Sequence, residues 1–313
     1  MADNHLQNPI FQDADLARQW LEARIWPKGP VCPHCGSFNA TKLEGKAHRP
    51  GLYQCNEPEC REQYTVTVGT LFERSKIPLN KWLMALYLLM ASKKGMSALQ
   101  MSRMLGISYK STWFVMHRLR EALREGKFSG PIGGDNKVVE ADETYVGGKA
   151  INRKNKVPAK EAAFALVERD GKVRTFHVPK VNAKTLKPIV DAQIHRDSYV
   201  MTDDATVYPS ILKEFKGHGS VNHSAQEYVR GMFWHINTVE NYFSILKRGI
   251  TGTYHHVSQQ HLKRYLAEFD FRYNERKNLG VTDMERTEKA AKGIVGKRLT
   301  YRRTRQHKEA EAV

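Results

Sequence analysis

The sequence predicts a multidomain protein: a small zinc-binding module, a helical helix-turn-helix domain and an α/β core with a mixed sheet. Three observations support this prediction. All four cysteines fall between residues 32 and 60, two short helix patterns joined by a tight turn follow, and strands then alternate with helices from residue 137 onward. With 313 residues, 41% of them hydrophobic, the chain is long enough for two or three packed domains. A disordered protein is therefore excluded.

The charge balance favours a polyanionic partner. The chain has 50 Lys and Arg against 33 Asp and Glu, which gives a formal net charge of +17. No run approaches the roughly 18 apolar residues of a membrane span, and the polar first residues lack the apolar stretch of a signal peptide. We therefore expect a cytoplasmic protein without a membrane segment. Four cysteines are too few for a disulfide scaffold, and clustered cysteines in a reducing compartment more often bind metal.

The cysteines form two pairs, CPHC at residues 32–35 and CNEPEC at residues 55–60. Two such pairs, each closed by a tight turn, can present four sulfur atoms tetrahedrally to one Zn²⁺ ion. We expect an N-terminal helix and a zinc ribbon within residues 1–78, and His34 and His48 lie close enough to be substitute ligands. A region this small cannot be expected to fold without its metal. The predicted zinc ligands are Cys32, Cys35, Cys55 and Cys60.

Residues 79–130 are expected to form a helical domain. A buried helix near residues 79–95 is followed by a helix that Ser97 can cap, a tight turn at Gly106, and a second helix that Ser108 can cap. This is the pattern of a DNA-binding helix-turn-helix, although many helix pairs in enzymes share the turn and touch no nucleic acid. The residues of the second helix predicted to face DNA are Tyr109, Lys110, Ser111, His117, Arg118 and Arg120.

Residues 131–285 are expected to form an α/β core after a break in composition at Gly130–Gly134. Three strands in a meander are followed by strands that alternate with helices, which is the element order of a ribonuclease-H-like fold. The basic residues 286–313 are expected to form a partly ordered tail. The predicted strands cover residues 137–148, two segments around the turn at 170–171, and 197–204, and the predicted helices cover 183–194, 207–215, 236–250 and 258–274.

Three carboxylates could carry chemistry in this core. Asp142 lies in the first strand and Asp203 at the end of a later strand, so both would reach one edge of the sheet. Glu240 lies on the helix from Ile236, on a polar stripe beside the apolar one. Lys247, seven residues after Glu240, points the same way and could hold a backbone phosphate. Three oxygen ligands of this kind suit Mg²⁺ or Mn²⁺.

Each carboxylate has a competitor nearby. Glu140 and Glu143 compete with Asp142, and Asp204 competes with Asp203. Asn237 could replace Glu240 as a neutral third ligand. A basic stretch over residues 149–160 could also follow phosphates beside the site.

These motifs carry a family resemblance. The series CPHCGS, VGTLFERSKIPLNKW, ADETYVGGK, TDDATVY, HINTVENYFSILKRGITGTYHHVS and FDFRYNER resembles the bacterial insertion-sequence transposases of the ISXO-like group, which join a zinc ribbon to a DDE core, over roughly residues 10–280. The resemblance implies that Asp142, Asp203 and Glu240 are the DDE triad and that Lys247 contacts the transposon end. Because such families can carry Asn near the third acid, Asn237 stays an alternative.

The resemblance also implies Mg²⁺ dependence, recognition of terminal inverted repeats and action as a homo-oligomer associated with the nucleoid. The expected reaction hydrolyses a phosphodiester at the element's end and then transfers the exposed 3′-hydroxyl to target DNA, without an organic cofactor. One rival is a non-catalytic DNA-binding regulator built from the same N-terminal modules. Another rival is a nuclease or resolvase that hydrolyses DNA without strand transfer.

Overall fold

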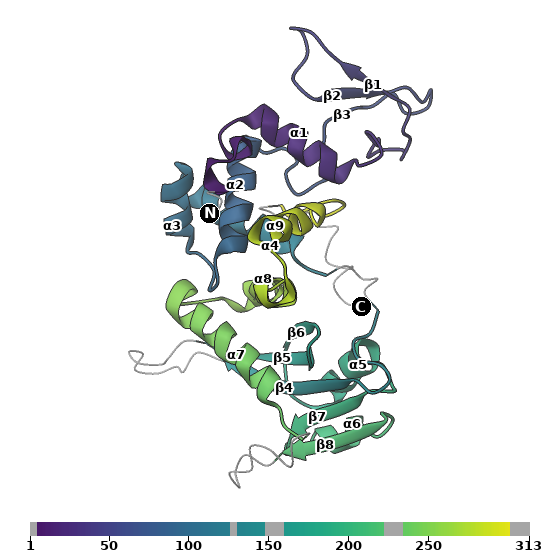
Figure 1. Ribbon diagram of the computed structural model, residues 1–313, viewed down its shortest axis with the longest axis vertical. Helices are drawn as coiled ribbons and strands as arrows, with labels where there is room; N and C mark the ends of the chain where they lie inside the picture. The colour runs from purple at the N-terminus through teal and green to yellow at the C-terminus, as the bar shows by residue number, and fades with distance from the viewer. Residues whose placement is uncertain (1–4, 126–129, 148–159, 222–233, 301–313) are drawn as a thin grey trace. The chain divides into compact units, whose positions relative to one another are not determined.

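The computed structural model describes residues 5–125, 130–147, 160–221 and 234–300 (Figure 1). The chain divides into two compact units. The first holds residues 1–92, 96–123 and 281–313, and the second holds residues 93–95 and 124–280. The first unit is therefore discontinuous, because the chain returns to it after the second unit is complete. Among the described residues, no helix combines the length and the hydropathy needed to cross a membrane.

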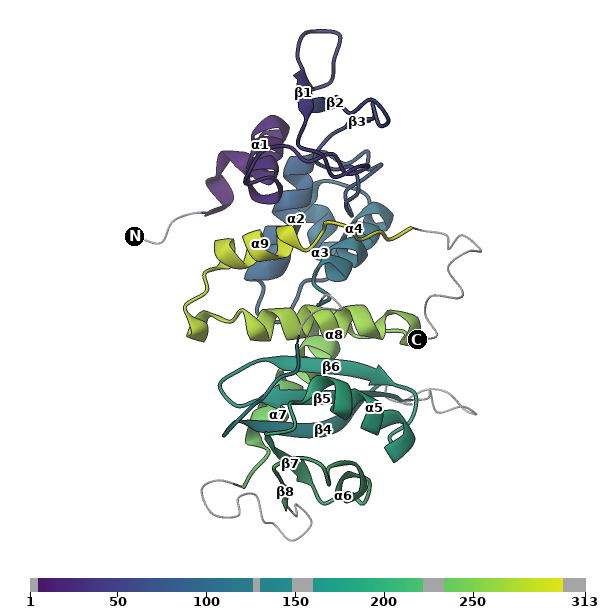
Figure 2. The ribbon, with the colours of Figure 1, turned by 90° about the vertical axis from the view of Figure 1, so that its right-hand side faces the viewer.

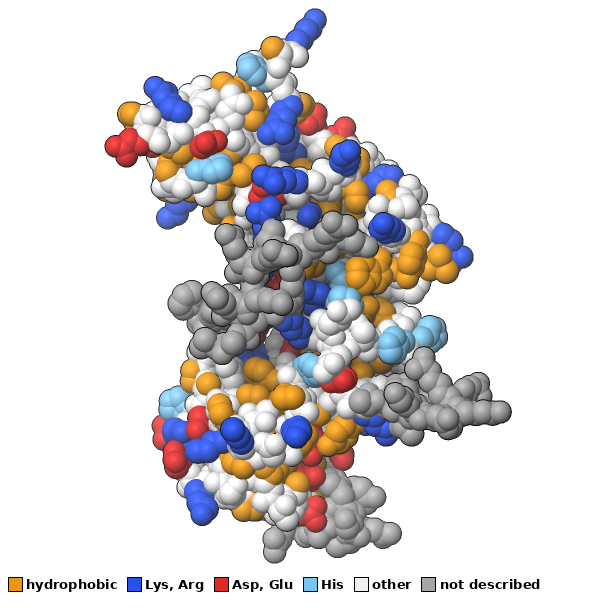
Figure 3. Space-filling view, turned by 180° about the vertical axis from the view of Figure 1, so that it is seen from behind, with side chains coloured by type: hydrophobic (Ala, Val, Ile, Leu, Met, Phe, Trp, Pro, Cys, Tyr) orange, Lys and Arg blue, Asp and Glu red, His pale blue; other side chains and the backbone are white. Residues whose placement is uncertain are grey.

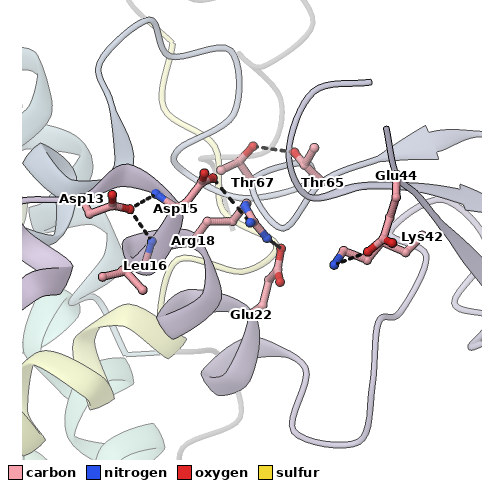
Figure 4. A network of polar contacts seen from close by, with 9 residues as sticks. All are labelled: Asp13, Asp15, Leu16, Arg18, Glu22, Lys42, Glu44, Thr65 and Thr67. Carbon is pink, nitrogen blue, oxygen red and sulfur yellow. Dashed lines mark hydrogen bonds and ion pairs between the residues drawn. The ribbon is translucent and has the colours of Figure 1, made fainter. Parts of the chain in front are cut away.

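The first unit begins with helix α1 (Ala14–Ile25). The carboxylate of Asp13 accepts hydrogen bonds from the free N–H groups of Asp15 and Leu16 in the first turn of this helix, at 2.7 and 2.8 Å, as an N-cap residue should. Arg18 then bridges two acids of the same helix, with Glu22 at 2.9 Å and Asp15 at 3.4 Å (Figure 4). Helix α1 is thus stabilised by local charge pairs as well as by packing.

The cysteine region forms a three-stranded antiparallel sheet of β1 (Ala40–Leu43), β2 (Leu52–Cys55) and β3 (Gln63–Tyr64), in that order. The turn before β2 needs a glycine, because Gly51 has a φ of +72° and a Cβ there would lie 2.4 Å from the Cδ atom of Arg18. Helix α1 therefore packs closely on this turn of the ribbon. The prediction of an N-terminal helix followed by a ribbon agrees with this arrangement.

Helices α3 (Ala98–Leu105) and α4 (Tyr109–Ala122) are joined by a short turn. Ser97 and Ser108 cap them through their hydroxyl oxygens, at 3.1 and 3.2 Å from backbone N–H groups. Gly106 ends α3 in the left-handed region, with a φ of 62°. The predicted elements, caps and turn are all present.

The exposed face of α4 differs from the prediction. His117 and Arg120 were expected to face outward, but their exposed fractions are 1% and 2%. The reason is that α4 is covered on two sides, by α2 (Leu79–Ala91) and by the C-terminal segment, whose Lys297 donates from Nζ to the carbonyl of Ala122 at 2.9 Å. A tertiary partner from the far end of the chain cannot be read from the periodicity of α4. Tyr109 and Lys110 remain exposed as expected.

The C-terminal segment also differs from the expected tail over its first part. Residues 283–292 form helix α9 (Asp283–Lys292), which begins with a capping box between Thr282 and Glu285. This helix packs on α1 and α2. Its Arg286 donates to the carbonyl of Met90 at the end of α2, at 2.7 Å. Although its composition is basic, this segment is helical because one side of the helix is buried against the first unit. Residues 301–313 lie outside the described part of the chain.

The second unit contains one five-stranded sheet in the order β6-β5-β4-β7-β8 (Figure 2). The three strands of the meander pair antiparallel, and β7 and β8 continue from β4 in parallel. The sheet is therefore mixed, as predicted. The strands are β4 (Val138–Val146), β5 (Glu161–Glu168), β6 (Val173–Val178), β7 (Tyr199–Asp203) and β8 (Gly217–Val221).

Helices cover both faces of this sheet. The even-numbered positions of β4 belong to the core with α7 (Asn237–Gly249) and α8 (Gln259–Asn274), and the odd-numbered positions belong to the core with α5 (Ala183–Gln193) and α6 (Tyr208–Ile211). Helix α6 is a single turn, shorter than the helix predicted for 207–215, because the chain bends away to enter β8. The face under α7 and α8 is the one that carries the predicted acids.

We predict that Arg286→Ala destabilises the first unit by about 2 kcal/mol, because the substitution leaves the carbonyl of Met90 without its charged donor. Urea unfolding followed by circular dichroism measures the change. Lys292→Ala, which truncates an exposed side chain on the same helix, is the control and should change stability little. Equal stability of Arg286→Ala and the control would contradict the packing of α9.

Candidate active site and zinc site

The four cysteine sulfur atoms meet at one point of the ribbon. All lie within 4.8 Å of one another, with 3.7 Å between the Sγ atoms of Cys32 and Cys60 and 3.5 Å between those of Cys35 and Cys55. No histidine is needed to complete this set of four, and His34 and His48 are both exposed. Four thiols gathered from two separate turns suit structural Zn²⁺.

The surroundings of the cysteines favour a bound cation. Burial raises the pKa of the Cys55 thiol to about 12, so its deprotonation needs a positive charge close by. The aromatic rings of Trp26, Tyr53 and Tyr64 pack beside the cysteines with ring centroids 5.4 to 5.8 Å apart. This small apolar shell surrounds the cysteines, which agrees with a fold that depends on metal.

Asp142 and Asp203 lie side by side on two parallel strands. The register of β4 and β7 places Glu140 opposite Met201, and each aspartate follows two residues later on its strand. Since side chains two residues apart share a face, both aspartates lie on the face that α7 and α8 cover. The predicted meeting of these two acids at one edge is therefore present.

Glu240 comes to the same face from α7, which packs on β4 and β5. The buried stripe of this helix contains Val239, Tyr242, Phe243 and Leu246, as the sequence pattern predicted for three of these four residues. Asn237, Glu240, Ser244 and Lys247 are all exposed and form the neighbouring polar stripe. Asn237 is the first residue of the helix and Glu240 lies one turn later, on the same stripe.

The acids are close enough to influence one another. Burial, together with the negative charges of Asp203, Glu143 and Glu240, raises the pKa of the Asp142 carboxyl to about 7, although a backbone N–H bond at 2.7 Å opposes the rise. In the described part of the chain, the cysteines are the one group of three or more ligand side chains within 4.8 Å of one another. The carboxylates of Asp142, Asp203 and Glu240 therefore lie near one another, but their oxygen atoms are more widely spaced than the cysteine sulfur atoms.

Glu143, a predicted competitor of Asp142, points to the opposite face of the sheet. Its carboxylate accepts a hydrogen bond of 2.5 Å from the hydroxyl of Tyr208 on α6. Burial and the charge of Asp203 raise the pKa of Glu143 despite this bond. Glu143 therefore lies near Asp203 but is held on the other face by the hydroxyl of Tyr208. Asp204, the competitor of Asp203, is exposed.

Glu140, the other competitor, has a role that sequence reasoning missed. Its side chain is fully buried and accepts the backbone N–H groups of Thr238 and Val239 at 2.8 and 2.9 Å. These are free N–H groups at the start of α7, so Glu140 caps the helix from a neighbouring strand. Arg169 pairs with the same carboxylate at 2.6 Å. The only sequence signal was its place on the same strand face as Asp142.

Two further polar residues of the second unit, His235 and Tyr242, have structural partners. His235 lies 3.4 Å from the Glu140 carboxylate. Tyr242 donates from its hydroxyl to Asp270 at 2.6 Å inside the core, where burial raises the pKa of Asp270 to about 7. A buried tyrosine held in this way is not placed to act as a nucleophile. The basic stretch predicted to follow phosphates lies, apart from Lys160, outside the described residues.

The comparisons with known proteins agree with this arrangement. Residues 133–274 match the family model of the ISXO2-like transposase domain, and residues 13–63 match that of the transposase zinc-ribbon domain. An uncharacterized protein in transposable element ISH50 of Halobacterium salinarum is 26% identical over 272 residues, which cover 79% of this chain and 86% of the relative. An uncharacterized transposase-like protein of Haemophilus influenzae is 32% identical over 104 residues, which cover 33% of this chain and 81% of the relative.

We predict that the purified protein carries one Zn²⁺ ion, that Cys55→Ser loses it, and that this variant unfolds in the ribbon, because zinc binding supplies the folding free energy of such modules. Elemental analysis measures the metal, and limited proteolysis within residues 32–64 reports the unfolding of the ribbon. His48→Ala is the control and should keep the metal. Loss of zinc from His48→Ala, or its retention in Cys55→Ser, would overturn the four-cysteine assignment.

A second prediction concerns pH. The pKa of Asp142 is about 7 in the folded protein against about 3.9 in an unfolded chain, so the folded state binds more protons between these values and loses stability as the pH rises through them. Without added Mg²⁺, Asp142→Asn should therefore be more stable than wild type at about pH 8, and this advantage should exceed that at about pH 5 by on the order of 2 to 3 kcal/mol.

Urea unfolding at the two pH values measures this difference. Asp204→Asn, which neutralises the exposed neighbour of Asp203, is the matched control. An advantage of Asp142→Asn that does not change with pH would show that the acids are not crowded.

Proposed function

Because the chain belongs to the ISXO2-like transposases, we propose that it cleaves DNA at the terminal inverted repeats of an insertion sequence and transfers the 3′ ends to target DNA. One observation carries the proposal: Asp142, Asp203 and Glu240 come from β4, β7 and α7 to one face of the sheet, close enough to raise the pKa of Asp142. Crowded carboxylates cost stability, and a bound divalent cation removes that cost.

The topology supports a ribonuclease-H-like core. Three antiparallel strands are followed by two parallel ones, the first strand lies in the centre of the sheet, and helices cover both faces. In this arrangement the acid of the central strand and the acid at the end of its parallel neighbour meet without any special loop. The third acid needs only a helix on that face, and α7 provides it.

Asp142, Asp203 and Glu240 would hold Mg²⁺ or Mn²⁺, and their oxygen atoms fit such ions. Ions bound there would activate the attacking oxygen and stabilise the leaving oxygen in a displacement at phosphorus. The chain's own contribution is to position the acids and to neutralise phosphate charge. Lys247, two turns after Glu240 on the same exposed stripe, is placed to hold a backbone phosphate, and Asn237 is the alternative third ligand.

The first unit supplies the DNA-binding modules of the proposal. Helices α3 and α4 would act as a helix-turn-helix, with exposed Tyr109 and Lys110 at the start of α4 placed to enter the major groove. Lysine and arginine side chains recur over the surface of this unit (Figure 3). The net charge of +17 suits a DNA partner. Synapsis of two element ends would require a homo-oligomer.

A DNA-binding regulator without catalysis is the strongest rival. It needs no acids at the edge of the sheet, and it gives no reason to place Asp203, Glu143 and Glu240 where their charges oppose the ionisation of the buried Asp142. The regulator would gain stability by replacing them. Their presence favours an enzyme.

We predict that Asp142→Asn and Glu240→Gln each abolish strand cleavage and transfer with Mg²⁺, by at least about a thousandfold, because each loses a ligand charge. Binding to the ends in a gel shift should persist. Asn237→Ala should keep most activity if Glu240 is the third ligand. Asp204→Asn is the matched control.

Two outcomes would count against this assignment. Full cleavage by Asp142→Asn would refute the triad, and loss of activity in Asn237→Ala but not in Glu240→Gln would move the third ligand to Asn237. Joining of pre-cut ends to a second duplex separates a transposase from a nuclease, which only hydrolyses.

A further inference from the structure

A hollow of about 230 Å³ lies in the first unit where three distant segments meet. Residues 70–74, which follow the ribbon, form one wall, α4 forms another, and residues 298–300 close it from the C-terminal side. Three arginines line the hollow, Arg74, Arg118 and Arg298, against one carboxylate, that of Glu73. The lining therefore has an excess of positive charge.

The C-terminal segment is fixed at this place by backbone bonds. The N–H of Leu71 donates to the carbonyl of Ile294 at 3.2 Å, and the N–H of Gly296 donates to the carbonyl of Gly69 at 2.9 Å. A β-bridge between Thr70 and Val295 lies between these two bonds. Arg298 is thus carried to the hollow by an ordered part of the chain, in residues that neither matched family domain covers.

Arg118 is held rigidly at the base of the hollow. Its guanidinium donates to the carbonyls of Leu71 at 2.8 Å, Glu73 at 3.2 Å and Leu299 at 3.2 Å, and it lies 4.7 Å from the ring centroid of Phe114. No carboxylate of the described residues lies within 4.0 Å of it. Burial, and then the charge of Arg298, lower the pKa of Arg118. The charge of Glu73 opposes this decrease, so the charge of Arg118 is positioned and only partly offset by a described carboxylate.

The other two arginines can reach an incoming group. The side chain of Arg74 is 79% exposed, and its pair with Glu73 at 3.4 Å is a solvent-accessible one of little energy. Arg298 is also exposed. Guanidinium groups bind phosphate oxygens through paired N–H donors, so one fixed and two adaptable arginines suit a single phosphate group.

We propose that this arginine hollow binds a backbone phosphate of DNA beside the groove that receives α4. The inference rests on the proposed function, which makes DNA the partner. Lys110, Phe114 and Arg118 are spaced by four residues and so share one side of α4. Eight residues span about 12 Å along a helix, which is about the width of the major groove. A duplex that receives Lys110 in this groove presents a backbone phosphate near Arg118.

The test compares DNA binding of the wild-type protein with that of the double variant Arg74→Gln/Arg298→Gln, over a range of salt concentrations in phosphate-free buffer. Both side chains are exposed, so the fold should persist. The slope of log K against log salt should fall by about 0.9, the value for one phosphate contact, and affinity should drop about tenfold. Fluorescence anisotropy with a labelled duplex measures both quantities.

Two further variants test whether the effect depends on the position and the sign of the charge. Lys292→Gln removes an exposed charge from the same unit away from the hollow and should leave the slope unchanged. Glu73→Gln removes the carboxylate of the lining, keeps an acceptor for the N–H of Gly69 at 3.1 Å, and should tighten DNA binding. A decrease in affinity for Glu73→Gln would contradict the charge argument.

Equal slopes for the wild type and the double variant would overturn the proposal, whether or not the protein cleaves DNA. A reduced slope with no cleavage by the wild type would refute the proposed enzyme and leave the hollow standing. A third measurement adds inorganic phosphate and records the unfolding temperatures of the wild type and the double variant. If it raises the unfolding temperature of the wild type only, while DNA affinity is the same in both proteins, the hollow binds free phosphate and the DNA assignment is wrong.

Discussion

The arrangement of the candidate acids depends on one buried carboxylate, that of Glu140. Glu140 lies on β4 two residues before Asp142 and accepts the first free N–H groups of α7, the helix that carries Glu240. A carboxylate at a helix N-terminus gains from the helix dipole, and Arg169 at 2.6 Å neutralises its remaining charge. The strand that holds one acid is thereby joined directly to the helix that holds another. This fixes the start of α7 one turn before Glu240.

The fixed start of α7 offsets the electrostatic cost of placing acids around Asp142. Burial of Asp142 opposes its ionisation, and the charges of Asp203, Glu143 and Glu240 add to this cost. Without a firm support the helix could move away and relieve the repulsion. Glu140 is paired and fully hydrogen-bonded, whereas Asp142 is left with a raised pKa, so two carboxylates on one strand face have opposite energetic roles. The same pattern of residues in the sequence does not distinguish them.

That difference shows what the sequence could and could not predict. Short-range signals predicted the ribbon cysteines, the caps at Ser97 and Ser108, the meander and the polar stripe of α7, because each depends on spacing within one element or between elements adjacent in the sequence. The burial of His117 depends on which elements pack on α4. The helix at 283–292 depends on a surface that α1 and α2 provide. Periodicity contains no information about such partners. For the same reason the sequence suggested Glu140 only as a rival ligand.

The return of the chain to its first unit links the two ends of the sequence in folding. Helix α2 is buried along most of its length, and α9 supplies part of that cover through Arg286 and its neighbours. Residues 281–300 come after the whole α/β core, so this cover arrives last during synthesis. The arginine hollow is completed by the same segment, through Arg298. A chain that stops before residue 281 would therefore contain every predicted catalytic acid, yet its first unit would expose apolar surface on α2 and lack one wall of the hollow.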